Sequence, residues 1–147
     1  MGIQTVEGIL TGMLKLAGYN VFATKEYMSR VRGGNNSTEI RVSSKPVWAY
    51  VDSIDILVPL NKGAISHLRD RISADTVIIG EAELLGDEVA GDKLKFIETP
   101  FAKIANDFGN KIYSNVVAAG TLAGLLGMKL DDVCEYVKRS FSTKAAD

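Results

Sequence analysis

Two arginines and two glycines stand together in the first quarter of the chain, in an order typical of an anion-binding turn. Arg30 and Arg32 directly precede Gly33-Gly34, and Asn35 begins the polar stretch that follows. Adjacent glycines let a backbone adopt positive φ and bring its N–H groups close to a ligand. Guanidinium groups beside such a turn favour a carboxylate or a phosphate. The pattern therefore indicates contact with an anion, but it also fits a surface turn whose arginines pair with nearby acids.

The chain is poor in the side chains that usually carry catalysis. It has one histidine, His67, and one cysteine, Cys134. A single cysteine excludes an internal disulfide and a cysteine-ligated metal cluster within these residues. We expect His67 to be solvated on a helix surface and Cys134 to be a small core residue. No nucleophile with its base and no pair of tuned carboxylates can be recognised, which weighs against an enzyme that works alone.

Two other groups have both a structural and a functional interpretation. Trp48 and Tyr50 are able to stack on a ligand, but an aromatic pair near a strand more often packs in a core or an interface. A run of acidic residues after position 80 is expected to form a solvated loop. Its members are Glu81, Glu83, Asp87 and Glu88.

The elements that must position these residues alternate between helical and extended patterns. Apolar residues at helical spacing run from 6 to 17, and Gly18 follows as a C-cap would. Extended runs occupy 20–24, 39–43, 55–60, 76–79 and 94–97, with 47–51 as a further strand or an extended crossing segment. Helical patterns cover 64–72 and begin again near Pro100. The order predicts a three-layer α/β/α domain with a mostly parallel sheet.

The last third of the chain is predicted to be helical. One helix is expected within 110–127 and another over 132–141. Gly120 and Gly124 are four residues apart, so they share one face of the first helix. Each glycine costs roughly 1 kcal/mol against alanine in a helix interior. We therefore expect this face to pack closely, either against the sheet or at a subunit interface.

Composition restricts the class of protein further. The chain of 147 residues fits one domain with a sizeable core. A net charge of −1 gives no electrostatic reason to expect nucleic acid or an anionic membrane as a partner. No apolar run reaches the roughly 18 residues that span a bilayer. The first residues lack the basic region of a signal peptide, so a cytoplasmic protein is expected.

Several segments, in a consistent order, resemble a known family. They are Gly18-Tyr-Asn-Val-Phe-Ala, Tyr27-Met-Ser-Arg-Val-Arg-Gly-Gly-Asn-Asn-Ser, Ile40-Arg-Val-Ser43, Asp55-Ile-Leu-Val-Pro-Leu60 and the helix that begins at Ser114-Asn-Val-Val. Together they are similar to the gamma domain of the 2-oxoacid:ferredoxin oxidoreductases, which act on pyruvate, 2-oxoglutarate or branched-chain oxoacids. The likeness covers nearly the whole chain. The Arg-Gly-Gly form is closest to the version fused ahead of an alpha domain.

The start of the chain departs from the family pattern. The family opens with a strand and a Gly-x-Gly-Gly-Gln-Gly-Val turn, whereas Met1-Gly2-Ile3 matches only the end of that turn. The resemblance therefore raises the hypothesis that the sheet lacks its first strand. It also raises the hypothesis that residues 1–147 are a single gamma-type domain truncated at one or both ends.

The resemblance implies a noncatalytic role within a larger enzyme. Such enzymes use thiamine diphosphate, Mg²⁺ and 4Fe-4S clusters to convert a 2-oxoacid and coenzyme A to acyl-coenzyme A. This chain alone is expected to bind none of those cofactors. Its expected partners are alpha and beta subunits or a fused alpha domain, with ferredoxin or a ferredoxin-like subunit. Residues Arg30, Arg32, Gly33, Gly34 and Asn35 are the expected contact with coenzyme A or with a subunit.

Two other functions remain open from the sequence. One is a stand-alone α/β module that binds an anion or a nucleotide through the Arg-Gly-Gly turn, although no Gly-x-Gly-x-x-Gly follows a strand. The other is an assembly scaffold without a ligand.

Overall fold

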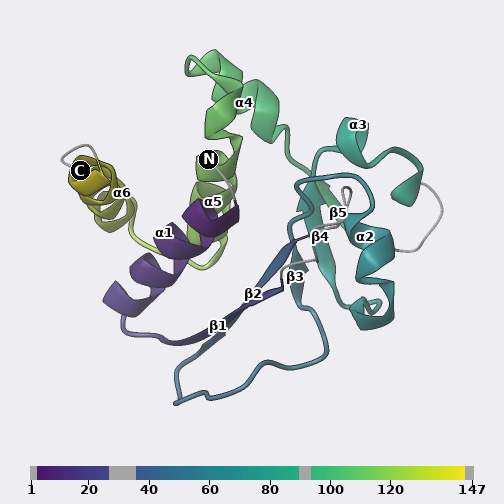
Figure 1. Ribbon diagram of the computed structural model, residues 1–147, viewed down its shortest axis with the longest axis horizontal. Helices are drawn as coiled ribbons and strands as arrows, with labels where there is room; N and C mark the ends of the chain where they lie inside the picture. The colour runs from purple at the N-terminus through teal and green to yellow at the C-terminus, as the bar shows by residue number, and fades with distance from the viewer. Residues whose placement is uncertain (1–2, 27–35, 90–93, 145–147) are drawn as a thin grey trace.

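The computed structural model describes residues 3–26, 36–89 and 94–144 (Figure 1). Helices and strands alternate through the middle of this range, and helices fill its last third. The elements are α1 (Ile3–Leu16), β1 (Asn20–Glu26), β2 (Ser37–Ser43), β3 (Ile56–Leu57), α2 (Ala64–His67), η1 (Arg69–Arg71), β4 (Val77–Gly80), α3 (Ala82–Leu85), η2 (Gly86–Glu88), β5 (Lys95–Glu98), α4 (Phe101–Asp107), η3 (Lys111–Tyr113), α5 (Ser114–Leu125) and α6 (Leu130–Lys144).

Strands β3, β4 and β5 form a parallel sheet in that order, which confirms the predicted parallel pairing. Ile78 and Ile79 are consecutive on β4 and nearly fully buried. Because successive side chains of a strand point to opposite faces, they enter different cores. Ile78 packs with Ile65 and Leu85 of α2 and α3, and Ile79 packs with Phe101 of α4 and with α5. Helices therefore cover both faces, and the three-layer prediction is confirmed.

Strands β1 and β2 pair with each other as an antiparallel hairpin and form a separate two-stranded sheet. Val21, Ile40 and Val42 share one face of this hairpin and pack against the core that α1 and α5 form. Thr24 and Glu39 are paired on the opposite face. The alternation of apolar and polar residues thus gives the hairpin one buried face and one polar face.

A connection of residues 44–55, the crossing segment, links β2 to β3 (Figure 1). It contains no strand, so the second of the two alternatives predicted for 47–51 holds. Trp48 is 81% exposed and Tyr50 is 54% exposed, so neither side chain lies in the core.

The predicted C-terminal helices are present, but two details differ. Helix α5 approaches its neighbours through Ala118, Ala119 and Ala123, which are buried. A Cβ built at Gly120 or Gly124 would meet nothing within 4 Å, so the expected packing of this face on the sheet is wrong within the described residues. The three alanines already allow the close approach that the spacing of the glycines suggested.

Cys134 is exposed, so its predicted place in the core is also wrong. Helix α6 packs on the core of α1 and α5 through Val133, Tyr136 and Val137. Cys134 lies one residue beyond Val133, which turns its side chain about 100° away from that narrow contact. Among the described residues, no helix has the length and apolarity needed to cross a membrane.

Candidate functional site

The predicted anion-binding turn falls outside the described residues. Its five members are Arg30, Arg32, Gly33, Gly34 and Asn35, all within 27–35. The structure does describe the hairpin on either side of them. Strand β1 ends at Glu26 and β2 begins at Ser37, and these two residues are paired. The candidate site is therefore described from the end of the hairpin that adjoins the turn.

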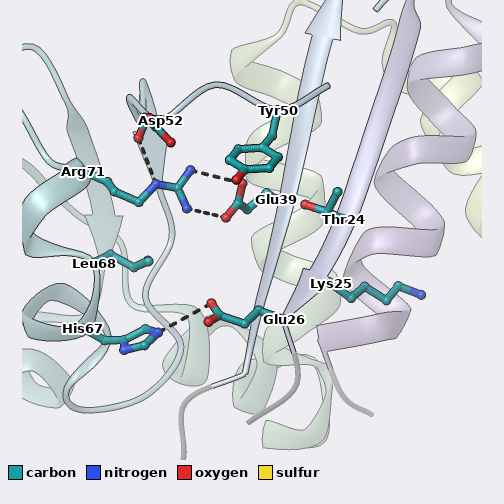
Figure 2. A pocket seen from close by; sticks show the side chains of 9 residues that line it. All are labelled: Thr24, Lys25, Glu26, Glu39, Tyr50, Asp52, His67, Leu68 and Arg71. Carbon is teal, nitrogen blue, oxygen red and sulfur yellow. Dashed lines mark hydrogen bonds and ion pairs between the residues drawn. The ribbon is translucent and has the colours of Figure 1, made fainter. Parts of the chain in front are cut away.

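An open cavity of about 400 Å³ lies on the polar face of the hairpin, between it and α2–η1 (Figure 2). The hairpin supplies one wall, the helical turn of α2–η1 supplies the facing wall, and the crossing segment covers one end. The lining residues are Thr24, Lys25, Glu26, Glu39, Tyr50, Asp52, His67, Leu68 and Arg71.

Arg71 is the centre of this cavity's hydrogen bonding. Its Nη1 and Nη2 donate to the two carboxylate oxygens of Glu39, a two-pronged contact in which the Nη2 distance is 3.1 Å. Its Nε donates to the carbonyl of Asp52 at 2.8 Å, and Nη2 also donates to the carbonyl of Val51 at 3.1 Å. The guanidinium carbon lies 5.9 Å from the ring centre of Tyr50. One side chain thus joins η1, β2 and the crossing segment.

The partners of Arg71 favour its protonated form. The hydrogen bond to Glu39 raises the pKa of Arg71 above its ordinary value. Burial opposes this increase, and the negative charges of Glu39 and Asp52 and the nearby Tyr50 add to it. The guanidinium therefore stays protonated throughout the working pH range.

His67 lies on the surface, as predicted, and faces the hairpin one turn before Arg71. Its Nε2 lies 3.7 Å from Oε2 of Glu26, and its side chain is 28% exposed. The same Glu26 oxygen accepts a hydrogen bond of 3.1 Å from the Ser37 hydroxyl. Lys25 belongs to the opposite face, since its ammonium group pairs with Glu7 of α1 at 2.8 Å. Figure 2 shows Lys25 pointing away from the other side chains.

The carboxylates of Glu26 and Glu39 in this cavity therefore have partners from the same chain. Glu39 is bound by Arg71, and Glu26 by Ser37 and His67. The hydrogen bond that the Ser37 hydroxyl donates to Glu26 is exposed to solvent. No group of three or more histidine, cysteine, aspartate or glutamate side chains that could hold a metal ion occurs in the part of the chain that the structure describes. The contacts hold the hairpin, α2–η1 and the crossing segment relative to one another.

A second set of contacts lies where the parallel strands lead into their helices. Glu88 of η2 accepts hydrogen bonds from the backbone N–H groups of Gly63 and, at 3.2 Å, Ile65, at the start of α2. An anionic side chain at this position satisfies N–H groups that a helix leaves unpaired. The prediction of a solvated acidic loop is therefore wrong for Glu88, while Glu83 and Asp87 are exposed as expected.

Two more glutamates act in the same way. Glu98, at the end of β5, accepts a hydrogen bond of 2.8 Å from the N–H of Ala82 at the start of α3. Glu81, directly after β4, accepts one from the N–H of Ala102 in the first turn of α4. The helices after all three parallel strands are thus capped by carboxylates from neighbouring connections. The predictions from the sequence did not include Glu98. Its place at the end of an extended run was the sequence signal that could have indicated this cap.

The comparison with known proteins agrees with this fold. A family model described as pyruvate ferredoxin/flavodoxin oxidoreductase matches residues 1–147. Because the match covers the whole chain, the chain belongs to the pyruvate ferredoxin/flavodoxin oxidoreductase family. The family predicted from the sequence is confirmed.

Curated relatives are subunits of named oxidoreductases. The chain is 26% identical over 126 residues to 2-oxoglutarate synthase subunit KorC of Archaeoglobus fulgidus, covering 85% of this chain and 65% of that subunit. It is 27% identical over 122 residues to 2-oxoacid:ferredoxin oxidoreductase subunit alpha of a Sulfolobus species, covering 82% of this chain and 18% of that subunit. The chain thus spans less than two thirds of the length of these relatives.

Two solved structures share the fold. One is 2-oxoglutarate:ferredoxin oxidoreductase from Magnetococcus marinus with 2-oxoglutarate, coenzyme A and succinyl-CoA bound. It has a TM-score of 0.83 at 21% identity, over 97% of this chain and 25% of that one. The other is the gamma subunit of a keto/oxoacid ferredoxin oxidoreductase from Geobacter sulfurreducens, with a TM-score of 0.66 at 20% identity over 88% of this chain and 75% of that one. At these identities the likeness supports the fold.

Proposed function

We propose that this chain is the noncatalytic gamma domain of a 2-oxoacid:ferredoxin oxidoreductase that works with thiamine diphosphate. In that reaction a 2-oxoacid and coenzyme A become acyl-coenzyme A and CO₂, one proton is released, and two electrons pass to ferredoxin. The observation that carries the proposal is the family match over residues 1–147. The shared fold of a gamma subunit over 88% of the chain supports the same assignment.

The residues of this chain do not fit the redox cofactor of such an enzyme. A 4Fe-4S cluster is held by cysteine thiolates, and the chain has only Cys134. We therefore propose that other subunits or domains supply the iron–sulfur clusters, thiamine diphosphate and Mg²⁺. This division is consistent with a cavity in which the Glu26 and Glu39 carboxylates bind side chains of the same chain.

The proposed partners are alpha and beta subunits, or an alpha domain on the same polypeptide, with ferredoxin or a ferredoxin-like subunit as electron acceptor. The relatives carry subunit names, and one of them is an alpha subunit of which this chain matches 18%. The sequence region that resembles the fused version of the family adds support. We place the complex in the cytoplasm.

The proposed contact with coenzyme A or a partner's acids is the turn of Arg30, Arg32, Gly33, Gly34 and Asn35. Two arginines beside adjacent glycines suit phosphate or carboxylate oxygens. The two options respond differently to Arg32→Ala in the assembled enzyme. A raised apparent KM for coenzyme A with intact assembly supports the ligand contact, and dissociation of subunits without a change in KM supports the partner contact.

A stand-alone nucleotide-binding module is less well supported. Open α/β sheets usually bind phosphates beyond the carboxyl ends of their strands, at helix N-termini. Here the helices that follow β3, β4 and β5 are capped by the carboxylates of Glu88, Glu98 and Glu81. A phosphate at that edge would meet these negative charges.

Co-purification from the native source tests the proposal. We expect the chain to elute with thiamine-binding and iron–sulfur subunits or domains. The preparation should reduce a viologen dye only when a 2-oxoacid and coenzyme A are both present. A chain that elutes alone, from a cell extract that retains this activity in other fractions, would contradict the proposed function.

A further inference from the structure

The crossing segment is exposed, but three of its backbone carbonyls accept hydrogen bonds from side chains. Trp48 and Tyr50 are more than half exposed, and the segment forms no strand. Arg41 of β2 donates from Nη1 to the carbonyl of Ala49 at 2.9 Å. Arg71 donates to the carbonyls of Val51 and Asp52. Side chains of two arginines thus provide the hydrogen bonds that a sheet partner would otherwise give these carbonyls.

Arg41 belongs to the hairpin, whereas Arg71 comes from a third element, η1, and binds both the hairpin and the crossing segment. Its contacts with Glu39 reach β2, and Glu39 is paired with Thr24 of β1. Figure 2 shows Arg71 extending from η1 across the cavity, with Glu39 and Tyr50 on the far side. The same guanidinium therefore sets the positions of the hairpin and the crossing segment relative to η1.

The geometry of the guanidinium explains why arginine is required. Its hydrogen bonds use Nε, Nη1 and Nη2 in one plane, directed at a carboxylate and two carbonyls. A lysine ammonium carries the same charge but has one donor atom on a flexible stem, so it cannot reproduce this fork. Lysine at this position would keep the charge and lose the positioning.

We propose that Arg71 is a positioning residue, which holds the hairpin and the crossing segment in the single arrangement needed for coenzyme A use by the assembled enzyme. The functional part of this inference rests on the proposed function, whereas the structural part concerns only the contacts of Arg71. No contact of Arg71 with a substrate is required. Its loss is expected to act through the elements that it joins.

The experiment compares Arg71→Lys, Glu39→Gln and Arg139→Lys in the assembled complex. Arg139 belongs to α6, which lies on the opposite side of the molecule from α2 in Figure 1, so its variant is a matched control for the loss of a guanidinium. Hydrogen exchange read by mass spectrometry reports the order of each peptide of this chain. Steady-state kinetics report the apparent KM for coenzyme A and kcat separately.

We expect Arg71→Lys to speed exchange in β1, β2 and residues 49–52, while α5 keeps its wild-type rate. The apparent KM for coenzyme A should rise about tenfold with kcat within about twofold of wild type, because a misplaced binding element weakens binding before it alters the chemical step. Glu39→Gln should lie between wild type and Arg71→Lys, since an amide retains an acceptor. Arg139→Lys should match wild type in both readouts.

If the hairpin and the crossing segment exchange at the wild-type rate in Arg71→Lys, the inference is overturned, whatever the kinetic constants are. Faster exchange with an unchanged KM would overturn its functional part. A uniform gain of exchange that includes α5 would show a general loss of stability and would also overturn it. Failure of the proposed function is seen separately, as a wild-type complex without coenzyme A-dependent dye reduction.

Discussion

Tyr136 of α6 occupies the space where a side chain at Gly12 of α1 would lie. A Cβ built at Gly12 would be 1.8 Å from the Tyr136 hydroxyl oxygen. The hydroxyl is also 3.4 Å from the carbonyl oxygen of Gly8, one turn earlier on α1. The two helices therefore approach closely because α1 has no side chain at this position.

Replacement of Gly12 by alanine should destabilise the purified chain. Alanine favours a helix by roughly 1 kcal/mol over glycine, but forced displacement of a packed side chain costs about 1–3 kcal/mol. We expect the free energy of unfolding, measured by urea denaturation, to fall by up to about 2 kcal/mol as the difference of these effects. The double variant Gly12→Ala, Tyr136→Phe should recover little, because the ring carbons also lie within 3 Å of the new Cβ position. A stabilised Gly12→Ala variant would contradict the contact.

Gly120→Ala should have the opposite effect. A Cβ at Gly120 meets no atom within 4 Å, so the gain in helix propensity should stabilise the chain by roughly 0.5–1 kcal/mol. The second alternative left open from the sequence is that this face serves as a subunit interface. If it does, the same variant should weaken assembly while stabilising the chain. Analytical ultracentrifugation of the complex checks this, and unchanged assembly would exclude close packing of a partner on Gly120.

Much of the fold could be predicted because local patterns decided it. The β-branched runs that become β3 and β4, the stop at Gly18 and the helix start beside Pro100 each depend on residues close in sequence. Local pattern did not decide which helical glycine permits a close helix contact. Gly12 is needed because of Tyr136, which lies 124 positions later, whereas the more conspicuous Gly120 and Gly124 face open space.

The candidate site was less predictable for a similar reason. No prediction from the sequence singled out Arg71, because its role depends on Glu39 and on carbonyls of the crossing segment. Those partners come from elements whose arrangement the sequence pattern does not contain. Glu88 was likewise assigned to a solvated loop because its partners, at the start of α2, precede it by more than 20 residues.

Removal of the Glu88 carboxylate should destabilise the packing of α2. Glu88→Ala leaves two partly buried N–H groups of Gly63 and Ile65 without this acceptor, and loss of such charged hydrogen bonds costs about 1.5–3 kcal/mol. Urea denaturation should show this decrease in the free energy of unfolding. Glu83→Ala is the matched control, since Glu83 is exposed on the neighbouring α3, and it should change stability by less than about 0.5 kcal/mol. Equal effects of the two variants would rule out the cap.

The thiol of Cys134 should react in the folded chain. It is exposed on α6, whereas a buried thiol would require unfolding before it could be modified. We expect one equivalent of a thiol reagent such as 5,5′-dithiobis(2-nitrobenzoate) to react without denaturant, and Cys134→Ser to abolish the signal. Reaction only after addition of urea would show that the Cys134 thiol is buried, as the sequence predicted.

The coupling between Arg71 and Glu39 should not change when the pH is raised. The pKa of Arg71 is raised in the folded chain by its hydrogen bond to Glu39, so its contribution is fully present below the ordinary arginine pKa. That contribution is lost only as the pH rises through the still higher folded-state pKa, a window above the range in which the protein is handled.

A double-mutant cycle of Arg71→Gln and Glu39→Gln, read by urea denaturation, measures this coupling. We expect a value of about 1–2 kcal/mol, equal at pH 7 and at pH 10 because neither partner changes its charge between them. A lysine in place of Arg71 would bring a side chain that does titrate near the upper pH, so Arg71→Lys provides the contrast. A coupling below about 0.5 kcal/mol at both pH values would show that the contact is an ordinary surface ion pair rather than the junction of η1, β2 and the crossing segment. A coupling that decreases at pH 10 would contradict the raised pKa of Arg71.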